Sequence, residues 1–354
     1  MAISIDISQI KSALDSGTGI TREQALAVLS CEGIPLLSLL DLSAGIRFRH
    51  FGREVLIHIL NNAENGRCPE DCRYCAQSAS SSASIEVYAL KSDEEILAEA
   101  RAAHERGAFR YCMVFAGSEP SDERVEHLMG LVRTIKERWP LEVCVSPGRV
   151  TSEQARRLRA AGLDRLNHNL NTSSSYYSEI CSSHTYEERV QTVRAAKAAG
   201  LAVCSGVIVG MGETKEDVFQ MAKDLGALGA DSIPVNFFIP LEGVALKDPG
   251  ALTPEYCLRV LCLFRLMNPR TEIRMAAGRE RHLRSLQPLG LYVANSLFLG
   301  GYLNAQGGAD RETLAIVRDL GFSIRSEVPL EDLLKVEHPK VRIKDQKDLR
   351  PFCK

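Results

Sequence analysis

The chain has 354 residues, of which 45% are apolar and 25% charged, so it can bury one large core, either in two domains or in a single barrel. Its formal net charge of −2 excludes a broad basic surface, and we expect neither nucleic acid nor an anionic membrane as a partner. Asp6 lies where a signal peptide needs an apolar run, and no stretch approaches the roughly 18 apolar residues of a membrane span. We therefore expect a cytoplasmic protein whose 11 cysteines are ligands, reactive thiols or small buried side chains.

Residues 1–50 are expected to form a helical extension. Two stretches within them, TREQALAVLS and PLLSLLDLSAGIRFRH, have the pattern of helices. Helices in this position can cap the base of the domain that follows.

Residues 51–325 are predicted to form a barrel. Eight short runs rich in β-branched residues alternate with amphipathic stretches, which begin at cap residues such as Ser92 and Thr151 and end at glycines. This alternation is typical of a (β/α)8 TIM-type barrel of the α/β class, with functional sites at the C-terminal ends of the strands; a doubly wound sheet is the alternative. The charged tail, 326–354, is expected to be irregular. The predicted strands are 55–63, 110–117, 142–148, 165–170, 202–210, 232–238, 272–277 and 294–301.

The loop GRCPEDCRYCAQS follows the first predicted strand and carries Cys68, Cys72 and Cys75 in the spacing C-x3-C-x2-C. Thiolates bind zinc, copper(I) and iron-sulfur clusters. A structural zinc ion needs a fourth ligand such as His58 or another cysteine, whereas a 4Fe-4S cluster on three cysteines leaves one iron open to a substrate or cofactor. The place of the loop on the expected catalytic face favours the cluster over zinc.

With Tyr74 just before its last cysteine, the loop resembles that of the radical S-adenosylmethionine superfamily. The resemblance implies that the open iron chelates S-adenosylmethionine. One electron from the cluster then splits this cofactor into methionine and a 5′-deoxyadenosyl radical. Such a radical breaks unactivated C–H bonds, which acid-base side chains cannot do near neutral pH.

Four further residues lie within predicted strands and are expected to point into the barrel: Cys112, Cys144, Cys204 and Arg274. A buried guanidinium needs an anionic partner, and an iron-sulfur cluster can be one. Buried cysteines are commonly small apolar side chains. That is our expectation for Cys31, Cys181, Cys257, Cys262 and Cys353.

The chain resembles the biotin synthase family over about residues 50 to 300, in the order of the family's motifs: CPEDCRYCAQS, YCM, NHNLNTS, HTYEERV, VCSGVIVGMGET, PVNFFIPLEG and RMAAGRE. The resemblance implies a homodimeric sulfurtransferase whose lumen holds an auxiliary 2Fe-2S cluster on Cys112, Cys144, Cys204 and Arg274. This cluster donates sulfur after hydrogen is removed from C9 and then C6 of dethiobiotin, and biotin results. The partners implied are a low-potential electron donor of the flavodoxin or ferredoxin type and the iron-sulfur assembly machinery.

Polar residues that would hold the two small molecules are assigned by motif position. Alternation places Asn167, Asn169 and Asn171 on one face of the fourth strand and His168 on the other. Amides both donate and accept, which suits a ureido ring or ribose hydroxyls. The resemblance assigns Asn167, Asn169 and Asn236 to the substrate, and Asn169, Asn171, Arg189, Ile208 and Glu213 to S-adenosylmethionine. Tyr74 is assigned to S-adenosylmethionine only by its proximity in the cysteine loop.

Some positions depart from the common pattern of the family: VFAG after Cys112, VSPG after Cys144, and Asn171 where aspartate is frequent. The rival enzymes are other radical barrels, such as a hydrogenase-cofactor maturase or a methylornithine-type mutase. From other classes, the chain could be an iron-sulfur electron carrier or a zinc-stabilised scaffold. An electron carrier shields its cluster with a full ligand set, so the missing fourth cysteine counts against that reading.

Overall fold

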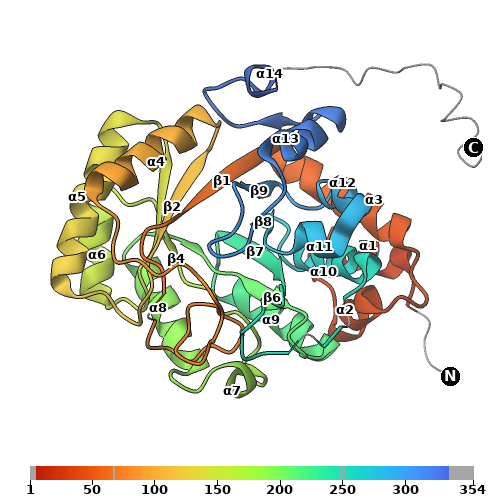
Figure 1. Cartoon of the computed structure of the whole chain (residues 1–354). Helices are drawn as coiled ribbons and strands as arrows, with labels where there is room; N and C mark the ends of the chain where they lie inside the picture. The colour runs from red at the N-terminus through yellow and green to blue at the C-terminus, as the bar shows by residue number, and fades with distance from the viewer. Residues whose placement is uncertain (1–4, 67, 248, 251, 335–354) are drawn as a thin grey trace, which may run out of the picture.

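The computed structural model describes residues 5–334 apart from 67, 248 and 251, and its strands form a closed parallel barrel surrounded by helices (Figure 1). Strand β9 pairs with β1 through Leu56 and Ser296, and this pairing closes the barrel. The predicted fold class is confirmed. The barrel strands are β1 (Glu54–Asn62), β2 (Arg110–Val114), β3 (Glu142–Ser146), β4 (Arg165–Asn167), β5 (Ala202–Cys204), β6 (Val207–Val209), β7 (Ser232–Phe237), β8 (Glu272–Met275) and β9 (Ser296–Leu299).

The fifth predicted strand, 202–210, is interrupted and forms both β5 and β6. Pro234 on the neighbouring β7 has no N–H to donate, and its ring lies against Gly206. A Cβ at Gly206 would lie 2.4 Å from the carbonyl oxygen of Pro234. The strand therefore breaks at residues 205 and 206. At this point Pro234 of β7 lacks an N–H donor, and Gly206 lacks a side chain that would clash with it.

The helices of the barrel begin where the sequence places cap residues. Ser92, Thr151 and Thr185 accept a hydrogen bond from the third helical residue, and each is part of a capping box. These helices are α4 (Asp93–Glu105), α5 (Asp122–Arg138), α6 (Ser152–Ala160), α7 (Tyr177–Ile180), α8 (Tyr186–Ala198), α9 (Lys215–Ala227), α10 (Pro254–Met267), α11 (Arg279–Leu283), the 3-10 turn η1 (Arg284–Leu286), α12 (Gln287–Gly290) and α13 (Asp310–Asp319).

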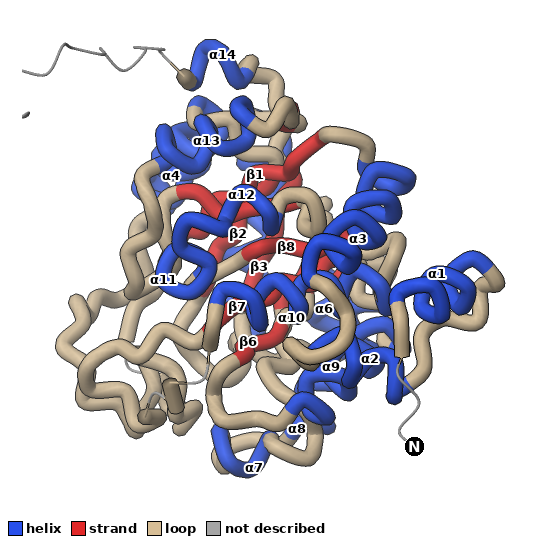
Figure 2. The backbone as a smooth tube through the Cα atoms, turned by 90° about the vertical axis from the view of Figure 1, so that its right-hand side faces the viewer, coloured by secondary structure: helices blue, strands red, loops and turns tan. Residues whose placement is uncertain are grey.

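The N-terminal extension contains α1 (Ile7–Asp15), α2 (Arg22–Leu29) and α3 (Leu36–Phe51), and α2 and α3 pack against α10 (Figure 2). Arg259 of α10 fixes this contact. Its side chain is buried and donates to the carbonyl oxygens of Val28 (3.2 Å) and Ile34 (2.7 Å).

At the other end of the chain, β10 (Ser323–Ile324) pairs with the first residues of β1. The expectation of an irregular tail from residue 326 is wrong for α14 (Leu330–Leu333), which is anchored by the buried side chains of Leu330 and Leu334. Residues 335–354 lie outside the part of the chain that the structure describes.

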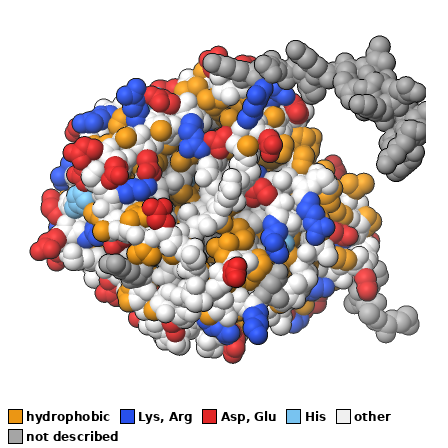
Figure 3. All heavy atoms as spheres, in the orientation of Figure 1, with side chains coloured by type: hydrophobic (Ala, Val, Ile, Leu, Met, Phe, Trp, Pro, Cys, Tyr) orange, Lys and Arg blue, Asp and Glu red, His pale blue; other side chains and the backbone are white. Residues whose placement is uncertain are grey.

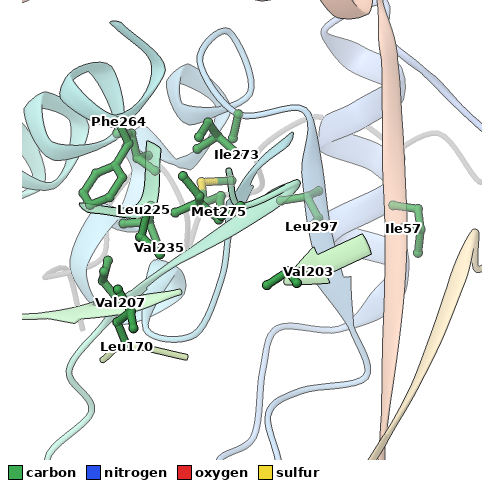
Figure 4. Close-up of a cluster of buried hydrophobic side chains, with 14 of the residues drawn as sticks. Ile57, Leu170, Val203, Val207, Leu225, Val235, Phe264, Ile273, Met275 and Leu297 are labelled. Atoms are coloured by element: carbon green, nitrogen blue, oxygen red, sulfur yellow. The ribbon is translucent and has the colours of Figure 1, made fainter. Parts of the chain in front are cut away.

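The hydrophobic core lies between the barrel and its helices. Figure 4 shows part of it, with Ile57, Val203, Val235, Ile273 and Leu297 projecting from the strands. All five side chains are buried. Because side chains alternate along a strand, the residues next to them point into the lumen, and these include the polar side chains of His58, Glu272 and Arg274. The fold is thus stabilised from outside the barrel, which leaves the lumen free for polar residues.

The face of the molecule in Figure 3 carries acidic and basic side chains side by side, as the small net charge suggests. Among the described residues, helices long and apolar enough to cross a bilayer are absent.

Gly206→Ala tests the close approach of β7. We expect the free energy of unfolding to fall by about 1–3 kcal/mol, because the new methyl group overlaps the backbone of Pro234. Gly130→Ala is the matched control: Gly130 is an exposed residue of α5 with nothing within 4 Å of an added Cβ. The control should be more stable than the wild type by about 0.5–1 kcal/mol. Denaturant titration of both variants measures the difference, and equal stabilities would contradict the explanation of the strand break.

Candidate active site

A cavity of about 390 Å³ opens at the C-terminal ends of the strands and gathers most of the predicted site residues. Four predicted residues, Cys144, Cys204, Glu213 and Arg274, are not part of its lining. The predicted residues that line it are Cys68, Cys72, Tyr74, Cys75, Cys112, Asn167, Asn169, Asn171, Arg189, Ile208 and Asn236.

Two carboxylates hold the three-cysteine loop in place. Asp71 accepts hydrogen bonds from the backbone N–H groups of Ser182 (2.9 Å) and Ser183 (3.0 Å). Glu70 accepts from Nδ1 of His184 at 2.6 Å and from the hydroxyl of Ser183. Burial works against the ionised form of Glu70, but hydrogen bonds with Ser118, Ser183 and His184 outweigh it and lower the pKa of Glu70 to about 2. The loop is therefore tied by charged acceptors to the segment between α7 and α8.

Cys181, which we expected to be only a small buried side chain, lies beside this loop. Its Sγ is 3.8 Å from Sγ of Cys72, and with His184 these residues form a group of potential metal ligands within 4.8 Å of one another. Both ring nitrogens of His184 already have partners, because Nδ1 bonds to Glu70 and Nε2 to the hydroxyl of Tyr177 at 2.8 Å. The group therefore packs against the loop and orients it. The spacing of a cysteine and a histidine three residues apart was the signal available in the sequence.

The other cysteines outside the predicted clusters divide by position. Cys257 and Cys262 are buried in α10, as expected of small apolar side chains. The same expectation is wrong for Cys31, whose side chain is exposed. Cys353 lies outside the described residues.

The asparagine segment leaves the strand earlier than predicted. Strand β4 ends at Asn167, and Asn171 has a φ of 69°, so strict alternation does not apply between these residues. His168, predicted to face away from the asparagines, lines the same cavity. Asn169 accepts the backbone N–H of Gly206 at 2.9 Å through Oδ1, which leaves its amide hydrogens free to point into the cavity. A left-handed residue is tolerated here because asparagine adopts that conformation more readily than most side chains.

Asn236 connects three neighbouring strand ends. Its amide group donates to the carbonyl oxygen of Val207 at 2.9 Å, and its Oδ1 accepts from the backbone N–H of Ala277 at 3.1 Å. One amide hydrogen and one oxygen lone pair remain for a ligand. Asn236 therefore has a structural task in addition to any contact with substrate.

Arg189 of α8 points inward. Its Nε donates to the hydroxyl of Tyr177 and to Nε2 of His184 (2.9 Å), and its Nη1 donates to the carbonyl oxygen of Asn169 (3.0 Å). These bonds fix the guanidinium group at the wall of the cavity, so it is not a solvated helix charge.

The GVIVGMGE segment contributes Ile208 to the cavity wall and a turn behind it. Glu213 accepts the backbone N–H groups of Gly210 (2.7 Å) and Met211 (2.8 Å). Burial raises the pKa of Glu213. Its carboxyl group thus stabilises the turn that follows β6, outside the cavity lining.

Below the cavity, the lumen contains a network of buried polar side chains, which we call the lumen network. Its members come from seven strands, so they meet only because the barrel is closed. They are His58, Arg110, Glu142, Arg165, Ser232, Glu272, Arg274 and Ser296.

The predicted lumen ligands border this network in two pairs. Cys112 and Cys144 are register partners on β2 and β3, and Nη1 of Arg274 lies 3.4 Å from Sγ of Cys204. Burial and the neighbouring Cys112 thiol raise the pKa of Cys144, so a metal is needed to hold this sulfur as a thiolate near neutral pH.

Two segments of the chain match known family models. Residues 65–225 match the Radical SAM superfamily, and residues 234–323 match the Biotin and Thiamin Synthesis associated domain. A biotin synthase from Magnetococcus marinus is 52% identical over 302 residues, which are 85% of this chain and 94% of that protein. The chain belongs to the biotin synthase family. Another biotin synthase, from Geobacillus kaustophilus, is 49% identical and covers 87% of this chain and 92% of its own.

Solved structures of two rival enzymes share the barrel of this biotin synthase family member. Methylornithine synthase has a TM-score of 0.75 at 21% identity and covers 91% of this chain and 98% of its own. The FeFe-hydrogenase maturase from Carboxydothermus hydrogenoformans has a TM-score of 0.77 at 19% identity, with 92% and 80% covered. At these identities the likeness shows the fold alone.

Biotin synthases work with a 4Fe-4S cluster and S-adenosylmethionine and with an auxiliary 2Fe-2S cluster, and the lumen of this chain fits the latter. Three arginines of the lumen network face two carboxylates, which leaves one positive charge uncompensated. His58 adds none, because burial and then Arg110 lower its pKa well below the usual value. Nε of Arg274 is buried without a partner among the described residues. An anionic cluster on thiolates would supply both the missing charge and an acceptor.

Asn236→Asp tests the structural task of Asn236. The carboxylate would face the carbonyl oxygen of Val207 where the wild type has an N–H donor, so we expect a loss of about 1–3 kcal/mol in the free energy of unfolding. Asn167→Asp is the control, because it makes the same change in the same cavity and the described residues give the Asn167 side chain no hydrogen bond. Urea titration without ligands compares the two. Equal losses would show that Asn236 has no special structural task.

Proposed function

We propose that Cys68, Cys72 and Cys75 hold the 4Fe-4S cluster, and that Cys112, Cys144, Cys204 and Arg274 hold the auxiliary 2Fe-2S cluster, of a biotin synthase reaction. Enzymes of this family are sulfurtransferases that insert sulfur into dethiobiotin at C9 and C6, and this chain performs that reaction. When bound, the two clusters supply the electron that cleaves S-adenosylmethionine and the sulfur that enters the product. The observation that carries the residue assignment is the presence, in one barrel, of an anchored cysteine loop at the mouth and a cation-rich cysteine pocket in the lumen.

The residues of the mouth would bind and orient S-adenosylmethionine. Arg189 would hold its carboxylate, since the guanidinium group is already fixed at the cavity wall by bonds to Tyr177 and Asn169. Ile208 would pack against the adenine, and Tyr74 would close the loop side. Asn169, Asn171 and Glu213 would hold the ribose and the turn beside it.

Asn167, Asn169 and Asn236 would hold the ureido ring of dethiobiotin between the two cluster sites. Each lines the cavity, and Asn236 keeps one donor and one acceptor free after its backbone contacts. The cavity wall also contains Phe115 and Phe298, which exclude water from the reacting carbon. Fixing the substrate between a source of radicals and a source of sulfur lets each carbon radical be trapped before it meets solvent.

The chain's partners are part of the same proposal. A low-potential flavodoxin or ferredoxin would provide the electrons, and iron-sulfur assembly machinery would rebuild the auxiliary cluster after its sulfur is used. We also propose that the protein acts in the cytoplasm as a homodimer, as the family resemblance implies.

A pair of cysteine variants tests the division between the two clusters. Cys72→Ala should abolish formation of 5′-deoxyadenosine, because S-adenosylmethionine is no longer cleaved. Cys144→Ala should still form 5′-deoxyadenosine but no biotin, because only the sulfur source is lost. Anaerobic incubation with dethiobiotin, S-adenosylmethionine and a low-potential reductant, followed by chromatography, measures both products.

Cys257→Ala serves as the control, since Cys257 is a buried thiol of the outer helix α10 and does not line the cavity. It should form both products at the wild-type ratio. Identical behaviour of Cys72→Ala and Cys144→Ala would overturn the assignment, and zinc without acid-labile sulfide in the purified protein would overturn the clusters themselves.

A further inference from the structure

Glu272 occupies the centre of the lumen network. This carboxylate accepts hydrogen bonds from Nη1 and Nη2 of Arg110 (3.2 and 3.1 Å) and from Nη2 of Arg274 (2.6 Å). The hydroxyls of Ser232 (3.1 Å) and Ser296 (2.9 Å) donate to it as well. Donors from β2, β7, β8 and β9 thus converge on one side chain, which is only 6% exposed.

The contact between Glu272 and Arg274 fixes the direction in which the guanidinium group points. Nη2 of Arg274 is held by Glu272 and by the hydroxyl of Ser232 at 2.9 Å. The ring of Phe298 lies against the group, 4.9 Å from its central carbon. Because a guanidinium group is planar and rigid, holding Nη2 turns Nη1 toward Cys204 and leaves Nε free.

Glu272 also separates two like charges. Arg110 and Arg274 both donate to it, so it bridges guanidinium groups that would otherwise face each other across the lumen. His58 also lies in this bridge: its Nε2 is 3.1 Å from Glu272, and its Nδ1 is 2.9 Å from Nη1 of Arg110. Without the carboxylate, the surplus charge of the network would rise from one to two, and Arg274 would be repelled from its place.

We propose that Glu272 is a positioning residue for the auxiliary cluster: it holds Arg274 in the orientation that presents Nη1 and Nε to the three-cysteine pocket, and its charge sets the electrostatic field at the cluster. The inference rests on the proposed function, since it concerns the cluster that Cys112, Cys144 and Cys204 would hold. Glu272 itself contacts neither the cavity nor these sulfurs among the described contacts, and acts through Arg274.

Glu272→Gln tests this role, because glutamine keeps the shape of the side chain and removes its charge. After anaerobic reconstitution of the full chain, we expect the auxiliary cluster to be lost to a chelator about tenfold faster than in the wild type, as a charge-assisted bond to Arg274 is gone. Its midpoint potential should shift to a more positive value, because a negative charge near the cluster has been removed. The 4Fe-4S cluster at the mouth should keep its wild-type iron content and potential.

Glu142→Gln is the matched control. Glu142 is also a carboxylate bonded to Arg110, with Nη2 at 2.8 Å, and it contacts Arg165 as well, but it has no contact with Arg274. The control removes the same charge from the same network but leaves Arg274 bonded to Glu272. We therefore expect its rate of cluster loss to stay within about twofold of the wild type. Equal cluster loss and equal potential shifts in the two variants would overturn a specific role for Glu272 and leave only a general charge effect.

The failure of this inference can be told apart from the failure of the proposed function. A wild-type chain that holds no auxiliary cluster after reconstitution contradicts the proposed function. If the wild type holds the auxiliary cluster and Glu272→Gln loses it at the same rate as the wild type, only the role of Glu272 is contradicted.

Glu272→Asp decides the matter if Glu272→Gln does not fold. Aspartate keeps the charge but is one methylene shorter, so it cannot hold Arg274 in the same place; we expect faster cluster loss with a smaller potential shift. Wild-type retention of the cluster in this variant would overturn the proposal.

Discussion

The buried charges of the lumen constrain the rest of this structure. Three guanidinium groups lie inside a closed barrel, where an uncompensated charge costs several kcal/mol or more. Glu272 and Glu142 supply two negative charges among the three, so one positive charge is left over in the network that places Arg274 beside the thiol of Cys204. The lumen is therefore prepared for an anion that thiolates can bring, and an aliphatic core of the usual barrel type could not fill it.

Charged side chains also organise the mouth of the barrel. Asp71 of the cysteine loop accepts backbone N–H groups of the segment after α7, and Glu70 accepts from the side chains of Ser183 and His184, so these bonds fix the loop. The asparagines lie between this loop and the lumen network, on strand ends whose positions are set by the outer hydrophobic core. In the proposed assignment, the substrate would lie between the radical source at the mouth and the sulfur source in the lumen, and this placement would control the reaction without acid-base side chains.

Local patterns in the sequence predicted the barrel because strands and helix caps depend on residues that are close in sequence. Ser92 and Thr151 cap helices as expected, and each predicted strand is present. They missed the break at Gly206, since it depends on Pro234 in another strand. They also misplaced His168, because alternation fails once β4 ends. The motif cysteines could be found from spacing, whereas Glu272 could not, because its partners come from strands far away in sequence.

The solved structures of the rival enzymes show that this barrel occurs in proteins named for different activities. Methylornithine synthase and the hydrogenase maturase share this barrel at about a fifth of identical residues, so the outer core and the strand order do not distinguish the three enzymes. A barrel whose stability comes from outside can change its lumen without losing its fold. In this chain the lumen combines cysteines with an arginine held by a buried carboxylate. In the proposed assignment, sulfur transfer would depend on these few residues, whose charges would balance once an anionic cluster is bound among them.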